Sequence, residues 1–242
     1  MAEPRENKMG VMPVKKLIIT MSLPMMISML VQALYNVVDS MFVARLSEDA
    51  LTAVTLAFPM QNALISFAAG TGVGINALLS KSLGEKKFDR ADAAANNGLF
   101  LGGMTYILFL LIGLFGAAPF IGTQIRDPLV REYGATYLRI CLCLSFGAIF
   151  QITFERLLQS TGRTFYSMIS QATGAVINII FDPIMIFGMF GFPKLGVAGA
   201  AYATVLGQVI AALISCSLNL KKNEDIRISI PQILRPDPDV IK

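Results

Sequence analysis

The sequence reads LVQALYNVVDSMFV over residues 30–43 and AVINIIFDPIMIF over residues 175–187. Each stretch is strongly apolar and contains one carboxylate, Asp39 in the first and Asp182 in the second. If the stretches cross a bilayer, each carboxylate costs roughly 2.5–3.5 kcal/mol on insertion scales. A chain that carries this cost twice is expected to use the acids. An acid inside a membrane is by default a proton site, a cation site or a substrate contact.

The composition indicates a membrane protein. The 242 residues are 55% hydrophobic and only 15% charged, with a mean hydropathy of +0.63, whereas a soluble domain carries about 25% charged residues. The deficit of charge extends over almost the whole chain, which predicts a polytopic, all-α membrane protein in contact with the lipid bilayer. The net charge of +4 comes from Lys and Arg in short loops, so it indicates topology and not a nucleic-acid partner.

No motif for catalysis is visible. The chain has no His, and it lacks a Ser/His/Asp set, a zinc motif and a P-loop. Cys141, Cys143 and Cys216 lie in apolar segments, where small packing roles are expected. The glycines of GTGVG at residues 70–74 are expected to let helices approach closely, not to bind phosphate. We therefore expect no enzymatic activity and no cofactor, and any proton chemistry must fall to carboxylates.

Six apolar stretches are long enough to cross a bilayer, which takes ~20 residues of helix. They lie near residues 17–43, 51–80, 93–118, 133–158, 165–189 and 197–220. Lys and Arg are concentrated before the first stretch, in alternate loops and after the sixth. By the positive-inside rule, both termini are predicted to be cytoplasmic.

This pattern predicts three parts in the chain: a cytoplasmic N-terminus (1–16), a six-helix transmembrane lobe (17–220) and a cytoplasmic linker (221–242). The linker is polar and contains prolines that break helices. Its composition is typical of a connection to a further segment, so we expect the linker to be truncated.

Other polar side chains share a helical face with each acid. They are spaced i, i+3 and i+7 around the first acid and i, i+4 around the second: Gln32, Tyr35 and Asp39, then Asn178 and Asp182, with Gln171 on the same stripe. Polar residues can also bond neighbouring helices as packing contacts, and for the two glutamines that alternative is equally strong. For the aspartates a functional role is favoured, because a neutral residue would bond helices at lower cost.

The two aspartates would share a proton or a cation if they approached each other. A bound Na⁺ would take oxygen ligands from carboxylates, Asn and Thr. The sequence does not choose between H⁺ and Na⁺.

Each acid has a proline in its own expected helix, Pro24 for Asp39 and Pro183 for Asp182. A proline removes one backbone hydrogen bond, so each helix can bend there. A static kink is the alternative to a bending role.

Three further charges fall in the fourth stretch. Glu155 and Arg156 are expected at its cytoplasmic end, as an interfacial ion pair or as side chains that reach the membrane surface. Arg139 lies deeper and is expected to face a cavity or to pair with an acid.

Several strings in this order resemble the multidrug and toxic compound extrusion (MATE) family of cation-coupled antiporters. They are VDSMFVARL (38–46) after Pro24, then ALTAV (50–54), GVG (72–74), LSKSLG (79–84), ERLLQSTGRT (155–164), NIIFDP (178–183) and FPKLGVAGAAYAT (192–204). Together they cover nearly the whole chain. The resemblance implies two six-helix lobes with a substrate cavity between them, so this chain is similar to the N-terminal lobe of a transporter that normally has twelve helices.

The resemblance also implies roles for individual residues. A cation-coupling site would comprise Asp39, Tyr35, Asn178, Asp182 and Thr204, and a Na⁺ ion would bind at Asp39, Asn178, Asp182 and Thr204. The substrate cavity would include Gln32 and Tyr137, and we add Gln171 because it shares the stripe of Asn178 and Asp182.

The expected function is a cation-coupled antiporter in the inner (plasma) membrane that uses H⁺ or Na⁺ to export cationic or amphipathic drugs or toxic metabolites. Its partners would be small organic molecules, the bilayer, and either the missing C-terminal lobe or a second copy. Three alternatives remain open: a half-transporter that pairs with itself, a flippase for lipid-linked precursors, and a membrane scaffold that transports nothing.

Overall fold

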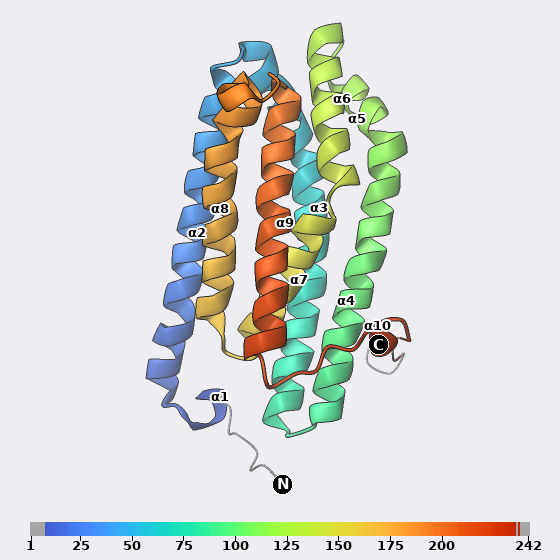
Figure 1. The fold of residues 1–242 in the computed structure, drawn as a ribbon. Coiled ribbons are helices and arrows are strands. Elements are labelled where there is room, and N and C mark those ends of the chain that lie inside the picture. The colour runs from blue at the N-terminus through green and yellow to red at the C-terminus, as the bar shows by residue number, and fades with distance from the viewer. Residues whose placement is uncertain (1–7, 236, 238–242) are drawn as a thin grey trace.

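The computed structural model describes residues 8–235 and 237, which form a bundle of long helices (Figure 1). In chain order the elements are α1 (Lys8–Val11), α2 (Val14–Ala44), α3 (Glu48–Gly84), α4 (Phe88–Leu111), the π-helix η1 (Ile112–Gly116), α5 (Ala117–Gln124), α6 (Pro128–Cys143), α7 (Phe146–Ser160), α8 (Thr164–Phe187), the 3₁₀ turn η2 (Met189–Gly191), α9 (Val197–Lys222) and α10 (Ile230–Ile233). The described residues contain no strand, which confirms the predicted all-α class.

The predicted spans correspond to these long helices. Five helices are long and apolar enough to cross a bilayer: Val14–Ala44, Glu48–Gly84, Phe88–Gln124, Thr164–Phe187 and Val197–Lys222. A sixth crossing exists if α6 and α7 are counted as one span, and this pair is bent by 46°. The predicted span near residues 133–158 therefore consists of two helices, α6 and α7, and not of one.

The break between α6 and α7 lies where neighbouring helices come very close. A Cβ atom on Gly113 of η1 would lie 3.1 Å from the backbone nitrogen of Cys143, and one on Gly147 of α7 would lie 3.0 Å from the backbone nitrogen of Val209 in α9. The Tyr106 hydroxyl donates to the carbonyl of Cys143 at 3.3 Å, at a helix end that leaves carbonyls unpaired. No proline lies between residues 129 and 160, so the sequence carries no signal for this break.

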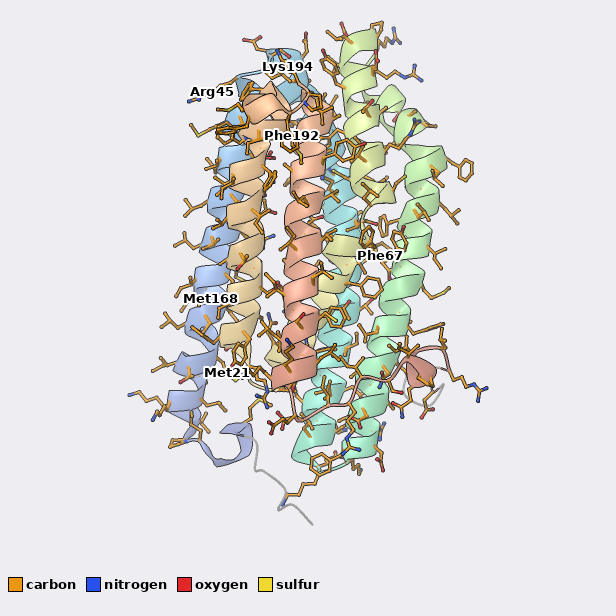
Figure 2. The ribbon with its side chains drawn as sticks, viewed as in Figure 1. Met21, Arg45, Phe67, Met168, Phe192 and Lys194 are labelled. Atoms are coloured by element: carbon orange, nitrogen blue, oxygen red, sulfur yellow. The ribbon has the colours of Figure 1, made fainter. Side chains whose placement is uncertain are left out.

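The helix α1 and the helix α10 lie at the same end of the bundle (Figure 1). Arg45, in the connection after α2, and Lys194, in the connection after α8, both lie at the opposite end (Figure 2). Two of the turns are closed by side-chain caps, since Ser47 accepts from the amide of Ala50 and Asp127 accepts from that of Leu129. The two ends of the described chain thus lie on one side, as an even number of crossings requires.

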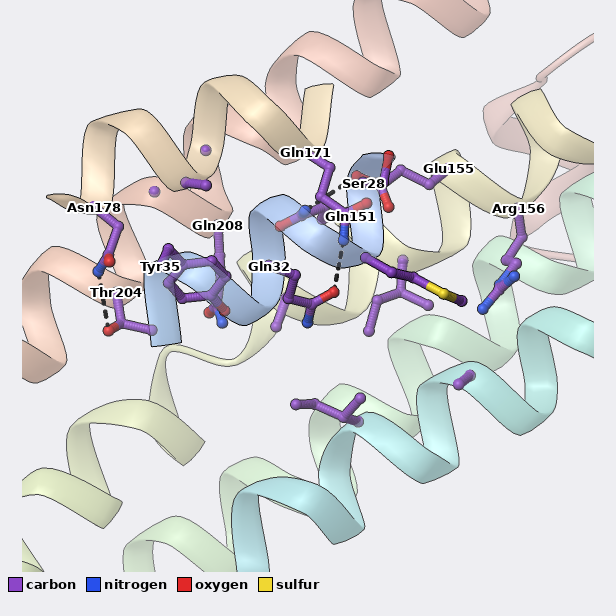
Figure 3. Close-up of a pocket in the computed structure, with 18 of the residues that line it drawn as sticks. Ser28, Gln32, Tyr35, Gln151, Glu155, Arg156, Gln171, Asn178, Thr204 and Gln208 are labelled. Atoms are coloured by element: carbon purple, nitrogen blue, oxygen red, sulfur yellow. Dashed lines mark hydrogen bonds between the residues drawn. The ribbon is translucent and has the colours of Figure 1, made fainter. Parts of the chain in front are cut away.

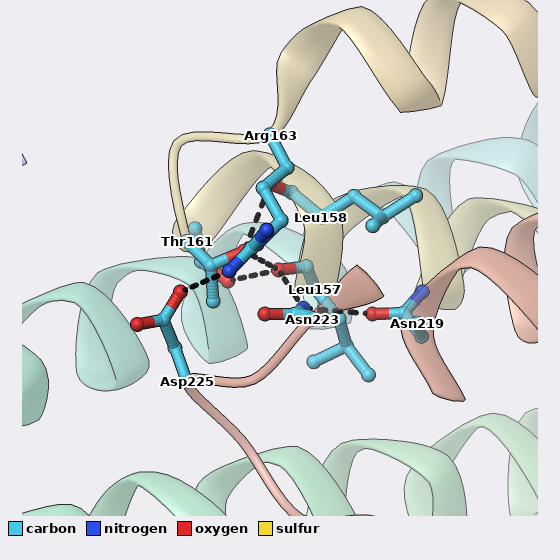
Figure 4. Close-up of polar contacts among 8 residues, drawn as sticks. Leu157, Leu158, Thr161, Arg163, Asn219, Asn223 and Asp225 are labelled. Carbon is cyan, nitrogen blue, oxygen red and sulfur yellow. Dashed lines mark hydrogen bonds and ion pairs between the residues drawn. The ribbon is translucent and has the colours of Figure 1, made fainter. Parts of the chain in front are cut away.

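The segment after α9 is docked on the bundle. We call residues 223–235 and 237 the strap. Asp225 forms an ion pair with Arg163 of the α7–α8 turn at 3.0 Å (Figure 4). Ile226 is only 6% exposed and packs in an apolar cluster with Leu79 and Leu157. The sequence predicts a linker here, and in the structure this segment packs against the lobe.

Two neighbouring asparagines of α4 hold the strap by its backbone. Asn96 is fully buried, donates to the carbonyl of Arg227 at 3.0 Å and accepts from the amide of Ser229 at 2.9 Å. Asn97 donates to the carbonyl of Asp237 at 2.9 Å and accepts from its amide at 3.0 Å. Each side-chain amide thus satisfies two backbone groups of a segment that has little helix of its own.

We expect the substitution Asn96→Ala to lower the free energy of unfolding by about 2–3 kcal/mol, because it removes several buried hydrogen bonds at once. The midpoint of thermal unfolding in detergent measures the effect. Asn62→Ala is the matched control, since Asn62 is exposed in α3 and its side chain bonds to no described residue. Equal midpoints for the two variants would contradict a docked strap.

Candidate functional site

Asp39 and Asp182 meet between α2 and α8. Asp182 is completely buried, and the two carboxyl groups lie within hydrogen-bonding reach of each other. The oxygen Oδ1 of Asp39 is buried and accepts no hydrogen bond from the described residues. A buried carboxylate oxygen without a donor, beside a second carboxyl group, is suited to receive a proton or a cation.

Asn178 joins Asp182 to α9. Both neighbours are satisfied when the Asn178 amide nitrogen donates to Asp182 Oδ2 at 3.2 Å and the amide oxygen accepts from the backbone nitrogen of Thr204 at 3.2 Å and from its hydroxyl at 3.3 Å. Asn178 is 3% exposed. The oxygens of Asp39, Asp182, Asn178 and Thr204 therefore belong to one polar cluster, which we call the acid cluster.

Close contact between α8 and α9 makes the acid cluster possible. A Cβ atom on Gly207 would lie 2.6 Å from the carbonyl oxygen of Gly174 and 3.3 Å from Cβ of Asn178. A Cβ atom on Gly174 would in turn lie 2.9 Å from the carbonyl oxygen of Gly207. Any side chain at either position would push the helices apart, so glycine is required for Asn178 to reach Thr204.

The other predicted residues lie on both sides of the acid cluster. Tyr35 lies close to both aspartates, and its hydroxyl lies next to the Gln32 side chain. Gln32 accepts from the amide nitrogen of Gln171 at 2.7 Å, which links α2 to α8. Tyr137 is 3% exposed and lies in the main apolar cluster.

A cavity of about 180 Å³ adjoins the acid cluster (Figure 3). Asn178 and Thr204 belong both to the acid cluster and to the cavity wall, and Tyr35 lines the cavity beside them. Tyr137 does not line the cavity. Five glutamines dominate the polar part of the wall: Gln32, Gln151, Gln159, Gln171 and Gln208. The wall can therefore offer many neutral hydrogen bonds to a ligand.

Glu155 and Arg156 lie at the cavity and do not pair with each other, contrary to the expected interfacial ion pair. Glu155 is only 7% exposed and accepts from Gln151 Nε2 at 3.0 Å and from the Ser170 hydroxyl at 3.3 Å. Arg156 donates instead to Gln159 Oε1 at 2.8 Å. Gln151, Glu155 and Gln159 are spaced i, i+4 and i+8, so their common face could have been found in the sequence. The burial of these side chains could not have been found in the sequence, because it depends on the neighbouring helices.

Arg139 is exposed and forms no ion pair with a described residue, so the expectation of a cavity or an acidic partner for it is wrong. Its position in α6 explains the difference, because the break after Cys143 ends this helix and the cavity is lined from α7 instead. The helices α2 and α8 continue without a break through Pro24 and Pro183.

Two curated proteins illustrate what this chain is similar to in sequence. The probable multidrug resistance protein YoeA of Bacillus subtilis is 29% identical over 224 residues, which cover 90% of this chain and 48% of that protein. The FAD transporter of Shewanella oneidensis is 28% identical over 87% of this chain and 47% of that protein. The chain thus spans about half the length of the curated relatives it matches.

Solved structures share the fold over the same part. A MOP superfamily transporter from Pyrococcus furiosus superposes with a TM-score of 0.90 and 28% identity, covering 100% of this chain and 52% of that one. A MATE structure in the straight conformation gives a TM-score of 0.88 (28% identity, 98% and 52% covered), and one in the bent conformation gives 0.83 (30% identity, 94% and 50% covered).

Residues 24–184, well over half of the chain, match the model of the family described as MatE. This match covers Asp39, Asn178 and Asp182 of the acid cluster, and it agrees with the names of the relatives and of the solved structures. The chain is a member of the MatE family of membrane transporters.

Proposed function

We propose that this chain forms one lobe of a cation-coupled antiporter that exports cationic or amphipathic compounds. The single observation that carries the proposal is the close approach of Asp39 and Asp182 in a buried cluster that adjoins a cavity. An acid pair in an apolar bundle is destabilising unless it holds a proton or a cation. Binding of that ion can therefore be linked to the state of the cavity next to it.

The proposed coupling ion is H⁺. Two carboxyl groups within hydrogen-bonding reach are stabilised when one carries a proton that the other accepts, because both cannot be ionised at that separation. Na⁺ is the alternative, with oxygen ligands from Asp39, Asn178, Asp182 and Thr204. No group of three or more Cys, Asp or Glu side chains among the described residues gathers for a more highly charged metal.

Helix α2 is the element that the ion would move. Only Ser28 and Val43 of its 31 residues, all of which the structure describes, are buried, so most of the surface of α2 faces away from the bundle. Its main neighbour is α8, on the side of the acid cluster. Because Pro24 leaves a backbone carbonyl unpaired, α2 can bend there when the ion changes the contact between Asp39 and Asp182. Related proteins solved in straight and bent conformations support this proposal.

The compound would bind in the cavity beside the acid cluster. A volume of about 180 Å³ is smaller than the ≈ 300–1,000 Å³ of sites for drug-sized ligands. The lobe would therefore hold only part of such a compound, and a second lobe or a second copy of this chain would enclose the rest. Large apolar side chains of α2, among them Leu30, Leu34 and Val37, are exposed and available to that partner or to lipid.

A flippase for lipid-linked precursors is less well supported. Such a protein needs a cationic cavity for an anionic headgroup. Among the described residues that line this cavity, Arg156 is the one basic side chain, and Glu155 lies next to it. The loops rich in Lys and Arg lie at the end of the bundle where α1 and α10 are found. By the positive-inside rule this favours a cytoplasmic location for both termini, and therefore an inner-membrane protein.

We expect Asp39→Asn and Asp182→Asn each to reduce efflux of ethidium to the level of cells without the protein, because an amide cannot take up and release the coupling ion. Efflux is measured in cells that produce the chain, alone and joined to a second lobe. Asp49→Asn is the control, since Asp49 is exposed in the first turn of α3. Normal efflux in both cluster variants would overturn the coupling role.

The coupling ion is tested in proteoliposomes that contain the same protein. We expect an imposed proton gradient to drive ethidium transport in Na⁺-free buffer, because the aspartate pair holds a proton. A Na⁺ gradient at uniform pH is expected to drive none. Transport by the Na⁺ gradient alone, lost in Thr204→Ala, would contradict the proton and indicate Na⁺.

Gly207→Ala is expected to slow efflux on the order of tenfold, because the added methyl group separates α8 from α9 and draws Thr204 away from Asn178. The control is Gly103→Ala, where a Cβ atom meets nothing within 4 Å. Efflux rates and thermal midpoints are measured together. Unchanged efflux in Gly207→Ala would show that the acid cluster does not depend on this contact.

A further inference from the structure

Glu155 is a buried carboxylate that the coupling proposal does not use. Gln151 donates to the oxygen Oε1 at 3.0 Å, and the Ser170 hydroxyl lies 3.3 Å from the same oxygen while it also donates to the Ala211 carbonyl at 3.0 Å. The other oxygen, Oε2, accepts no hydrogen bond from the described residues, and Glu155 lines the cavity. Oε2 is not among the fully buried side-chain atoms that lack a hydrogen-bond partner, so it is open to the cavity and available to a group that enters it.

The acid cluster is too far away to be that partner. The Glu155 carboxylate contacts Ser170 of α8, and Asp182 lies twelve residues further along the same helix. At 1.5 Å per residue this separation is ~18 Å along the helix axis. Glu155 therefore cannot share a proton directly with Asp39 or Asp182, and it forms a second polar centre near the other end of the cavity (Figure 3).

The neighbouring arginine, Arg156, forms no ion pair with Glu155. Its guanidinium donates instead to Gln159 Oε1 at 2.8 Å. The stem of Arg156 lies over Gly72, where a Cβ atom would be 2.7 Å from Arg156 Cγ. This glycine of α3, part of the GTGVG string, thus makes room for the arginine.

The rest of the nearby wall suits an amphipathic ligand. Met25, Met29 and Ile152 supply apolar surface, and methionine side chains adapt to irregular shapes. The remaining polar groups in this part of the cavity are amides, the Ser28 hydroxyl and the Arg156 guanidinium, which is bonded to Gln159. Among the described wall residues, Glu155 carries the carboxylate, and its charge favours a cation over a neutral molecule.

We propose that Glu155 Oε2 binds the positively charged group of the transported compound and thereby selects organic cations over neutral compounds of the same shape. This inference rests on the proposed function of cation export. A glutamine at position 155 would keep the bonds from Gln151 and Ser170 through its own carbonyl oxygen. The substitution Glu155→Gln therefore removes the negative charge without removing the hydrogen bonds that hold the side chain in place.

The test uses the purified chain in detergent and two aryl probes of similar size, the cation tetraphenylphosphonium and the neutral triphenylphosphine oxide. In Glu155→Gln we expect the affinity for tetraphenylphosphonium to fall roughly 30-fold or more, as for removal of one partner of a buried charge pair. Affinity for triphenylphosphine oxide is expected to stay within about twofold of the wild type, because a neutral probe has no charge for Glu155 to bind. Glu155→Asp keeps the charge and is expected to retain part of the cation affinity.

The control is Glu85→Gln, which removes an exposed carboxylate between α3 and α4 and is expected to change neither affinity. Unchanged binding of the cation by Glu155→Gln overturns the inference. An equal loss for both probes also overturns it, since that result indicates a structural role. Efflux by Asp39→Asn tests coupling independently, so failure of the cation selection by Glu155 leaves the coupling proposal standing. A wild-type chain that binds no tetraphenylphosphonium overturns both this inference and cation export.

Discussion

The backbones of α8 and α9 touch at Gly174 and Gly207, and the polar interior of the lobe depends on this contact. Without side chains at these two positions the helices come close enough for Asn178 to bridge Asp182 and Thr204. The bridge joins α8 to α9 on one side, and the aspartate pair joins α8 to α2 on the other. A membrane bundle has no hydrophobic driving force between its helices in lipid, so small residues and buried polar contacts supply the attraction.

The buried polar groups of the lobe form two separate centres, the acid cluster and the surroundings of Glu155. The acid cluster combines two carboxyl groups with an amide and a hydroxyl, a set of groups that can hold a small cation or a proton. The Glu155 centre has one carboxylate, two donors to a single oxygen and an arginine engaged elsewhere. Glutamines of α2, α7, α8 and α9 line the cavity between them. Ion binding and compound recognition can thus be separate in space while sharing one cavity.

The strap is held at one end of the lobe by hydrogen bonds and an ion pair to its backbone and side chains. Asn96 and Asn97 bind its backbone, Arg163 binds Asp225, and Ile226 fills an apolar cluster. Any segment that continues beyond the strap is therefore tied to α4 and to the α7–α8 turn. Movement of the bundle at those helices would be transmitted to whatever follows, through hydrogen bonds and not through a loose tether.

The sequence alone determined the all-α membrane class and the helical faces that carry Asp39 and Asp182. These features are local, since apolar length and the 3.6-residue period can be read within one helix. The family resemblance further placed Thr204 beside Asn178. The tertiary structure decided the 46° bend between α6 and α7, the burial of Glu155, the exposure of Arg139 and the docking of the strap. Each of these depends on contacts between segments far apart in the sequence, and no pattern within a single helix contains such contacts.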